Sequence, residues 1–448
     1  MKILLVHPPL DDIWLPVRRT ESLGIGYIAA VLRRDGHEVE VLDAYLRYLK
    51  PPEMVREILK REFDCLGLTA LDVYKKSLVY AAKKVRKSRK DAVIVAGGYF
   101  PTFMAAELLY ACREIDIIVR GEGEQSACEL FGKLAHLAHG EWQDTPGIAY
   151  VKDGSPVMNV VPPLISNLDS LPFPARDALG QRVRPTRALI SSSRGCFNRC
   201  SFCCTPSFFA LHGCRVPRFR DPVKVADEIE SVIADTALTD FVFADDDFIG
   251  PGQKCRERVV RLAEEIRGRK LKDFHFTIEC RADEVDEDLL KLLKEAGLTR
   301  VFLGIESGVQ RQLDTYNKRI TVDQNQRAVE IVRNSGAELV PGFIMFDAYS
   351  TVQETLDNFE FIRQAKMAER DDSLAMKFTT RLMLFGGAPI VEKLRSEGLI
   401  RQKGIFLSYR FKDWKFGLLY GLTQLLGKPM ELYRRIARLF GHAADLLS

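Results

Sequence analysis

This 448-residue sequence lacks long apolar runs. None of its hydrophobic stretches approaches the roughly 20 residues that a membrane-spanning helix requires. The apolar stretch at the N-terminus, MKILLVHPPL, is too short for a signal peptide, and no small-residue cleavage site follows it. We therefore expect a cytoplasmic protein without a membrane segment. In that reducing compartment, closely spaced cysteines indicate metal binding or catalysis rather than disulfides.

The sequence also lacks an excess of either charge. Its net charge of +4 gives no electrostatic reason to expect a nucleic acid partner. The one basic run, Lys83–Lys90, is interpreted as the solvated face and end of a helix. With 46% hydrophobic and 28% charged residues, the composition is typical of a globular protein with a sizeable core. The length favours two or three domains.

Strands and helices alternate through the first third of the chain. Apolar β-type runs lie at Lys2–His7, Glu38–Asp43, Asp64–Thr69, Ala92–Ala96 and Ile115–Val119, and helical patterns separate them. This alternation predicts an α/β fold with a doubly wound, Rossmann-like parallel sheet. The ligand of such a sheet lies at the carboxyl ends of its strands.

A second alternating series begins after a break in the pattern. The break holds a predicted β-hairpin at residues 147–160 and a proline-rich linker, Pro162–Asp177. Strands are then expected near residues 187–192, 240–244, 273–279, 300–305, 339–346 and 375–384. Six strand–helix units predict a partial (β/α)6 barrel, which carries its chemistry on the loops after the strands.

We place the domain boundaries where these patterns change. The first sheet domain covers residues 1–145, the hairpin and linker 146–185, the barrel 186–390, and a mostly helical C-terminal segment 391–448. Within that last segment, Met430–Leu447 places its apolar residues on one helical face. We interpret this helix as a cap on the fold, and a membrane-surface helix is the alternative.

Four of the ten cysteines lie within nine residues, in GCFNRCSFCC (Gly195–Cys204), directly after the first barrel strand. Cys196, Cys200 and Cys203 have the spacing C-x3-C-x2-C. Three thiolates on one tight loop can hold three corners of an iron–sulfur cubane and leave one iron open. A structural zinc site usually has four protein ligands, often in two separated C-x2-C pairs, and no second pair exists here. Zinc completed by His212 and Cys214 is the alternative.

The cysteine loop resembles the signature of the radical S-adenosylmethionine (SAM) superfamily, including the aromatic Phe202 before the last ligand. The resemblance implies a 4Fe–4S cluster on Cys196, Cys200 and Cys203. Its open iron would bind the amino and carboxylate groups of SAM, and one electron from the cluster would release a 5′-deoxyadenosyl radical. Cys204 is then the surplus thiol, expected as a small buried residue that points away from the cluster.

Polar segments follow three later barrel strands and resemble further SAM-binding segments of that family. They are Ala244–Phe248 (ADDDF), Cys280–Asp283 (CRAD) and Leu303–Gly308 (LGIESG). Each one alone is also compatible with a helix N-cap, where Asp and Ser are common. Together, at the same end of successive strands, they favour a ligand site. The resemblance assigns SAM binding to Phe202, Asp245, Asp246, Asp247, Arg281, Glu306 and Ser307.

The first domain resembles the cobalamin-binding domain that precedes this barrel in one branch of the superfamily, which includes class B methyltransferases. The resemblance rests on HPPL (His7–Leu10), Ser22–Ala44, VAGGYFPT (Val95–Thr102), VRGEGE (Val119–Glu124) and the linker Leu168–Asp177. It implies cobalamin contacts from His7, Pro8, Leu10, Trp14, Leu23, Thr69, Gly97, Gly98, Thr102, Gly121 and Glu122. The glycines alone are equally compatible with a dinucleotide-type fold or with a scaffold that binds no cobalamin.

One departure concerns the cobalt ligand. Many cobalamin domains carry D-x-H-x-x-G, whose histidine binds cobalt from below. Asp35–Glu40 (DGHEVE) lacks the final glycine and lies at the wrong end of the sheet, so we interpret it as a turn. Cobalamin is then expected without that histidine. The loop His7–Arg18 should lie near the lower face, with His7 as its one strong candidate ligand and Trp14 packing against the ring.

Together, the two resemblances imply C-methylation of an unactivated carbon in a small metabolite or peptide. The radical would remove a hydrogen atom and methylcobalamin would give the methyl group, while the protein places and shields the cofactors. An electron donor such as flavodoxin or ferredoxin is implied. A cyclase, ring-contracting or oxidative enzyme with the same cofactors is the runner-up. A non-catalytic module with a structural cluster or zinc is the alternative from another class.

Overall fold

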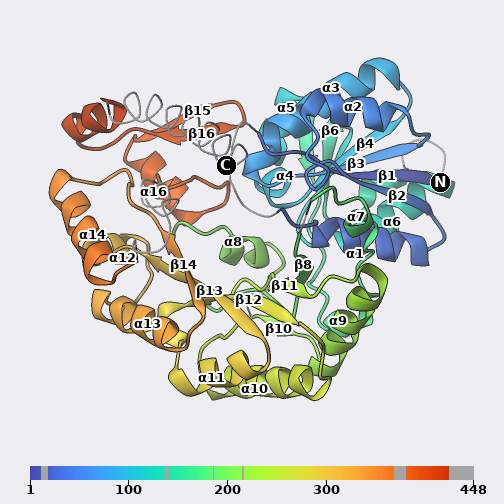
Figure 1. Ribbon diagram of the computed structural model, residues 1–448. Helices are drawn as coiled ribbons and strands as arrows, with labels where there is room; N and C mark the ends of the chain where they lie inside the picture. The colour runs from blue at the N-terminus through green and yellow to red at the C-terminus, as the bar shows by residue number, and fades with distance from the viewer. Residues whose placement is uncertain (12–18, 137–140, 185, 214–215, 368–379, 423–448) are drawn as a thin grey trace, which may run out of the picture.

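The computed structural model describes residues 1–11, 19–136, 141–184, 186–213, 216–367 and 380–422. An N-terminal sheet domain lies beside a curved sheet with helices along its outer side, and the C-terminal segment lies near the open end of that curve (Figure 1). Among the described residues, no helix is both long enough and apolar enough to cross a membrane.

The N-terminal domain is built on one seven-stranded sheet with the strand order β2-β1-β3-β4-β5-β6-β7. Its parallel strands are β1 (Lys2–His7), β2 (Glu38–Asp43), β3 (Cys65–Thr69), β4 (Val93–Gly97) and β5 (Ile117–Val119). The hairpin of β6 (Ile148–Lys152) and β7 (Ser155–Met158) continues the sheet antiparallel to β5. The predicted doubly wound sheet is confirmed, and the predicted hairpin extends it.

Helices cover both faces of this sheet because consecutive strand residues point to opposite sides. Ile3 and Leu5 of β1 pack with one helix layer, and Leu4 between them packs with the other. The first layer comprises α1 (Leu23–Arg34) and α6 (Gly123–His136), and the second α2 (Pro51–Leu59), α3 (Lys75–Ser88), α4 (Tyr99–Phe103) and α5 (Ala105–Ala111). Burial on both sides explains the continuous apolar runs of the strands.

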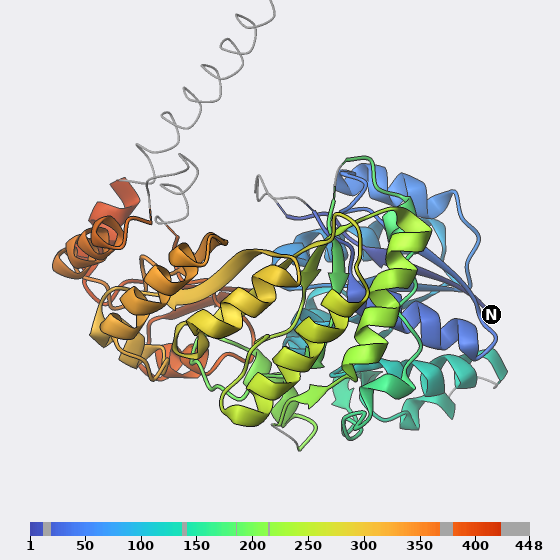
Figure 2. The same ribbon diagram turned by 60° about the horizontal axis from the view of Figure 1, so that its bottom comes forward.

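The second domain is a five-stranded parallel sheet with the order β14-β13-β12-β11-β8. The strands are β8 (Ala188–Ile190), β11 (Asp240–Phe243), β12 (His275–Arg281), β13 (Leu298–Glu306) and β14 (Glu338–Phe343). Helices α9 (Pro222–Thr236), α10 (Gln253–Gly268), α11 (Glu287–Glu295), α12 (Gln310–Thr315), α13 (Val322–Asn334) and α14 (Val352–Gln364) connect and cover them. Figure 2 shows the long helices along the outer face of the sheet. This arrangement is the predicted partial barrel.

The sixth predicted barrel strand, near residues 375–384, lies largely outside the described residues. Its described part forms one parallel bridge, between Phe346 and Arg381. Beyond it, α16 (Pro389–Ser396) leads into the antiparallel pair β15 (Ile400–Lys403) and β16 (Phe406–Tyr409). The expectation of a mostly helical C-terminal segment missed this hairpin, because four-residue strands give too short a pattern. The predicted helix Met430–Leu447 lies outside the described residues.

Candidate active site between the two domains

The cysteine loop begins where β8 and the short strand β9 (Ser193–Arg194) end. Gly195 starts the loop with a φ of 100°, a left-handed conformation that favours glycine. Its backbone N–H donates to Asp246 Oδ2 at 2.9 Å. The chain thus turns sharply out of the strand, and the three predicted cluster ligands share one loop at the strand ends.

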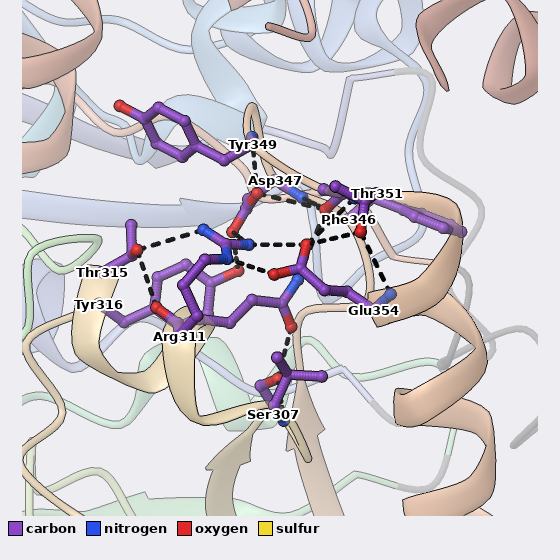
Figure 3. A network of polar contacts seen from close by, with 12 residues as sticks. Ser307, Arg311, Thr315, Tyr316, Phe346, Asp347, Tyr349, Thr351 and Glu354 are labelled. Carbon is purple, nitrogen blue, oxygen red and sulfur yellow. Dashed lines mark hydrogen bonds and ion pairs between the residues drawn. The ribbon is translucent and has the colours of Figure 1, made fainter. Parts of the chain in front are cut away.

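A buried network holds the middle of this loop from the side of α12. Ser201 donates its backbone N–H to Tyr316 O at 2.7 Å and its hydroxyl to Thr315 O at 2.8 Å. Phe202, predicted to contact SAM, packs edge-on against the Tyr316 ring with centroids 5.6 Å apart. Figure 3 shows the Tyr316 hydroxyl pointing to the buried Asp347, to which it donates at 2.9 Å. The loop therefore rests on a rigid polar support.

Each predicted cluster thiol lies beside an N–H donor. Asn198 N is 3.4 Å from Cys196 Sγ, Thr205 N is 3.4 Å from Cys203 Sγ, and Arg281 Nη1 is 3.6 Å from Cys200 Sγ. Such donors stabilise a thiolate, the form that binds iron. Burial raises the pKa of all three thiols, that of Cys203 to about 11, so metal binding must displace their protons. This donor set fits a cluster held through three cysteines.

Cys204 and His212 have other surroundings. Cys204 is half-buried at the N-cap of α8 (Thr205–Ala210), and burial raises its pKa to about 12. His212 Nδ1 donates to Pro162 O at 2.6 Å, and its Nε2 accepts the Glu122 backbone N–H at 3.1 Å. With both ring nitrogens engaged, His212 cannot complete the zinc alternative, and Cys214 lies outside the described residues. No three His, Cys, Asp or Glu side chains in the described ranges converge on a single-ion site.

Two of the three aspartates after β11 brace the cysteine loop. Asp245 accepts hydrogen bonds from the backbone and hydroxyl of Ser192 at 2.9 Å and from the hydroxyl of Ser193 at 2.8 Å. Both of its oxygens are therefore used within the protein. Asp246 accepts from Gly195 and, at 3.1 Å, from the hydroxyl of Thr205. The predicted SAM contacts Asp245 and Asp246 thus support the strand-to-loop turn.

Asp247 reaches the cysteine loop itself. Its Oδ2 is 3.3 Å from Asn198 Nδ2 and 3.7 Å from Cys196 Sγ. Glu284, which sequence reasoning missed, lies against it. Burial and the charge of Asp247 raise the pKa of Glu284 to about 9, so this carboxyl pair keeps a proton at neutral pH. None of the three aspartates caps a helix, because α10 begins only at Gln253.

Arg281, Glu306 and Lys318 form a charged group beside Cys200. Arg281 contacts the Cys200 sulfur and donates to Lys318 O at 2.6 Å, and Lys318 Nζ is 3.2 Å from Glu306 Oε1. A Cβ at Gly304 would lie 2.8 Å from Lys318 Nζ, so glycine leaves room for this pair. Sequence reasoning missed Lys318, since nothing in NKRIT distinguishes a buried lysine from a surface one.

Ser307 turns away from this charged group. It is fully buried, accepts from Val309 N at 2.9 Å and donates to Asn358 Oδ1 at 3.0 Å. These contacts join the start of α12 to α14. The hydroxyl of Ser307, a predicted SAM contact, is therefore used in hydrogen bonds between helices.

A cavity of about 590 Å³ lies between the domains, at the carboxyl ends of β1, β3, β4 and β5. It includes the β1/β3 position, where the strand order reverses and doubly wound sheets bind ligands. The predicted cobalamin residues His7, Leu23, Thr69, Gly97, Gly98, Gly121 and Glu122 line it. Pro8, Leu10 and Thr102 are not among the lining residues, and Trp14 lies outside the described residues. The barrel contributes Leu189, Ser191, Ser193, Arg194, Phe208, Phe209, Ala244 and Asp246.

Two glycine turns shape the cavity wall. Gly98 has a φ of 97°, and a Cβ there would lie 2.9 Å from Ala70 O. Gly121 has a φ of 73°, and a Cβ there would lie 2.4 Å from His212 Nε2. The Thr102 hydroxyl ties the turns, donating to Gly98 O at 2.8 Å and accepting from Gly121 N at 3.0 Å. Both turns therefore require glycine, because of their left-handed backbone and the protein atoms packed against them, and both line the cavity.

Comparison with known proteins gives both domains a family. Residues 18–131 match the B12 binding domain and residues 190–362 the radical SAM superfamily. An uncharacterized methyltransferase of Pyrococcus horikoshii is 28% identical over 371 residues, which cover 81% of this chain and 78% of the relative. The anaerobic magnesium-protoporphyrin IX monomethyl ester cyclase of Rubrivivax gelatinosus is 30% identical over 387 residues. That match covers 81% of this chain and 66% of the cyclase, just under two thirds of its length.

A solved structure shares the fold of nearly all of this chain. OxsB, a cobalamin-dependent S-adenosylmethionine radical enzyme, superposes with a TM-score of 0.76 at 22% identity, over 95% of this chain and 66% of that one. The family predicted from the cysteine loop and the first domain is thus confirmed, and with it the cofactor classes cobalamin, SAM and a 4Fe–4S cluster. With a B12 binding domain ahead of a radical SAM domain, the chain belongs to the cobalamin-dependent radical SAM enzymes.

Proposed function

We propose that the protein is a methyltransferase that acts on an unactivated carbon of a small molecule or peptide. One observation carries the proposal: the cavity beneath the glycine turns reaches Asp246, which braces the cysteine loop. Sites for cobalamin and for the cluster would therefore open to one space, as direct transfer to an activated carbon requires. The Pyrococcus horikoshii relative, named a methyltransferase, supports this outcome.

In this proposal, Cys196, Cys200 and Cys203 hold the cluster. Arg281 and Lys318 supply buried positive charge for a carboxylate, and Asp247 supplies a carboxylate for an ammonium group, which together suit the amino acid end of SAM. When bound, the cofactors supply a radical that removes a substrate hydrogen and a methyl group that replaces it. The protein's own residues orient these groups and exclude water.

A second candidate is cyclisation or oxidation with the same cofactors. It is favoured by the 30% identity to the Rubrivivax gelatinosus cyclase. The two candidates differ in the fate of the SAM methyl group, which appears in the product only for a methyltransferase. Both need a one-electron donor, for which we propose a flavodoxin or a ferredoxin.

The experiment follows that methyl group. Protein purified without oxygen is reconstituted with iron, sulfide and hydroxocobalamin, and about four irons and one cobalt per chain are expected after desalting. It is then incubated with a reductant, SAM carrying a deuterated methyl group, and metabolite or peptide extracts. Mass spectrometry should find a product that has gained the labelled methyl group, and Cys203→Ala should lose both iron and product. An unlabelled, dehydrogenated or cyclised product would favour the second candidate, and protein without iron would contradict both.

A further inference from the structure

His7 is the last residue of β1 and one of the residues that line the cavity. Its side chain is about nine-tenths buried, and its Nδ1 lies 3.1 Å from both carboxylate oxygens of Asp43. Asp43 ends the neighbouring strand β2, and its Oδ1 also accepts the Leu46 backbone N–H at 2.7 Å. A carboxylate held in this way accepts a hydrogen bond from Nδ1–H and so favours the tautomer in which Nε2 is the unprotonated nitrogen, which binds metals.

The packing of the ring fixes its direction. Tyr45 and Tyr74 contact it edge-on, with centroids 5.2 Å and 4.9 Å away, and both tyrosines line the same cavity. Within the part of the chain that the structure describes, the hydrogen bonds of the ring all go from Nδ1 to Asp43, and Nε2 has no partner. Nε2 is thus available to a ligand in the cavity that the ring lines.

His212 provides an internal comparison. It lies on the other side of the cavity wall, against Gly121, and backbone groups engage both of its ring nitrogens. Its hydrogen-bonding capacity is complete without a ligand. His7 has the opposite arrangement, because one ring nitrogen is bound to a carboxylate and the other is left for the cavity.

We propose that His7 Nε2 binds the cobalt of cobalamin on its lower face, with Asp43 orienting the imidazole as a positioning residue. The inference rests on the proposed binding of cobalamin in the cavity. The carboxylate–histidine–metal arrangement is one by which proteins raise the basicity of a histidine ligand. Here two adjacent strand ends supply it, whereas D-x-H-x-x-G supplies it from one continuous loop.

The test is the electron paramagnetic resonance spectrum of cob(II)alamin bound to the full chain. An axial nitrogen-14 ligand splits each cobalt line into three, and nitrogen-15 splits it into two. Protein grown on nitrogen-15 and loaded with unlabelled cobalamin should therefore change the pattern from triplets to doublets. Triplets that persist would assign the ligand to the nucleotide base of cobalamin and overturn the inference. Cobalt bound without any nitrogen splitting would also overturn it, leaving the proposed function intact.

Variants give an independent readout. His7→Phe, loaded with excess cobalamin, should lose the nitrogen splitting and bind cobalamin at least about tenfold more weakly, whereas His275→Phe, at an exposed histidine, should keep both the splitting and the affinity of the wild type. Asp43→Asn should keep the splitting while weakening cobalamin binding by about 10–100-fold, as removal of an outer partner typically does. Unchanged splitting in His7→Phe would overturn the inference. Wild-type protein that retains no cobalt would contradict the cobalamin function itself.

Discussion

Tyr316→Phe removes one buried hydroxyl from beneath the cysteine loop and leaves the ring that packs on Phe202. The Asp347 carboxylate is fully buried, and its Oδ2 accepts that hydroxyl at 2.9 Å. The nearest cation, Arg311 Nη2, is 3.8 Å away and is already paired with Glu354 (Figure 3). A hydrogen bond to a charged group contributes about 1.5–3 kcal/mol. We expect a loss of about 2 kcal/mol, because Arg311 can compensate only in part.

The assay is calorimetric unfolding of the variant, paired with iron analysis after reconstitution. At roughly 2–4 °C per kcal/mol for a domain of this size, the barrel transition should fall by about 4–8 °C. Iron content should stay at the wild-type level, because Ser201 bonds the Tyr316 carbonyl rather than its hydroxyl. The matched control is Tyr349→Phe, whose hydroxyl bonds Glu397 in an exposed position and should matter by under about 0.5 kcal/mol. Equal stability of the two variants would refute the reasoning.

Three further substitutions test other parts of the site. Cys204→Ala should bind as much iron per chain as the wild type after reconstitution. A lower iron content in this variant would identify Cys204 as a ligand. Glu284 has a pKa of about 9 against an ordinary 4.5, so the wild type should lose stability as pH rises from about 5 to 9. The side chain at Glu284→Gln cannot ionise, so the melting temperature of the variant should rise relative to that of the wild type over that pH range. A difference in melting temperature that stays constant with pH would contradict this. Gly121→Ala combines a positive φ with a clash against His212 and should weaken hydroxocobalamin binding at least about tenfold by titration. Unchanged affinity would place the ligand elsewhere.

The architecture was predictable where the packing is uniform. β1 has the sequence KILLVH, a continuous apolar run, because helices cover both faces of its sheet. The hairpin β15–β16 was missed for the opposite reason. Its first strand, IRQK, is short and largely exposed, so neither face imposes a periodic pattern. A strand or helix can be predicted from the sequence when it is long and buried enough to require a hydrophobic pattern.

The site divides in a similar way between local and long-range contacts. The three cysteines could be grouped from the sequence because their spacing places them on one loop, and their role as cluster ligands stays a prediction. The pairing of His7 with Asp43 depends on the parallel register of β1 and β2, which aligns these two residues across the sheet. Thr102 shows the same limit, since its hydroxyl accepts the backbone N–H of Gly121, 19 residues further along the chain, from outside the cavity lining. Side chains whose partners lie far away in the sequence give no local signal.

Buried ion pairs connect the two domains at their interface. Arg218 Nη1 of the barrel lies 3.0 Å from Oε2 of Glu122, in the turn after β5, and Arg194 Nη2 lies 2.7 Å from Oε1 of Glu124, in the first turn of α6. Burial, the largest single effect, would raise the pKa of Glu122, but the hydrogen bonds from Arg218 and the charges of Arg194 and Arg218 together outweigh it and hold this pKa below its usual range. Breaking one such pair leaves an uncompensated charge that costs about 3–5 kcal/mol. The domains therefore cannot slide past one another as two apolar surfaces could.

These ion pairs lie next to the two turns that border the predicted cofactor sites. Glu122 follows Gly121, whose turn forms the cavity wall, and Arg194 precedes Gly195, whose turn begins the cysteine loop. A shift at either pair would move one of these turns relative to the other. The separation between the cavity and the cysteine loop therefore depends on paired charges at the interface, whereas the core of each domain positions only its own part of the candidate site.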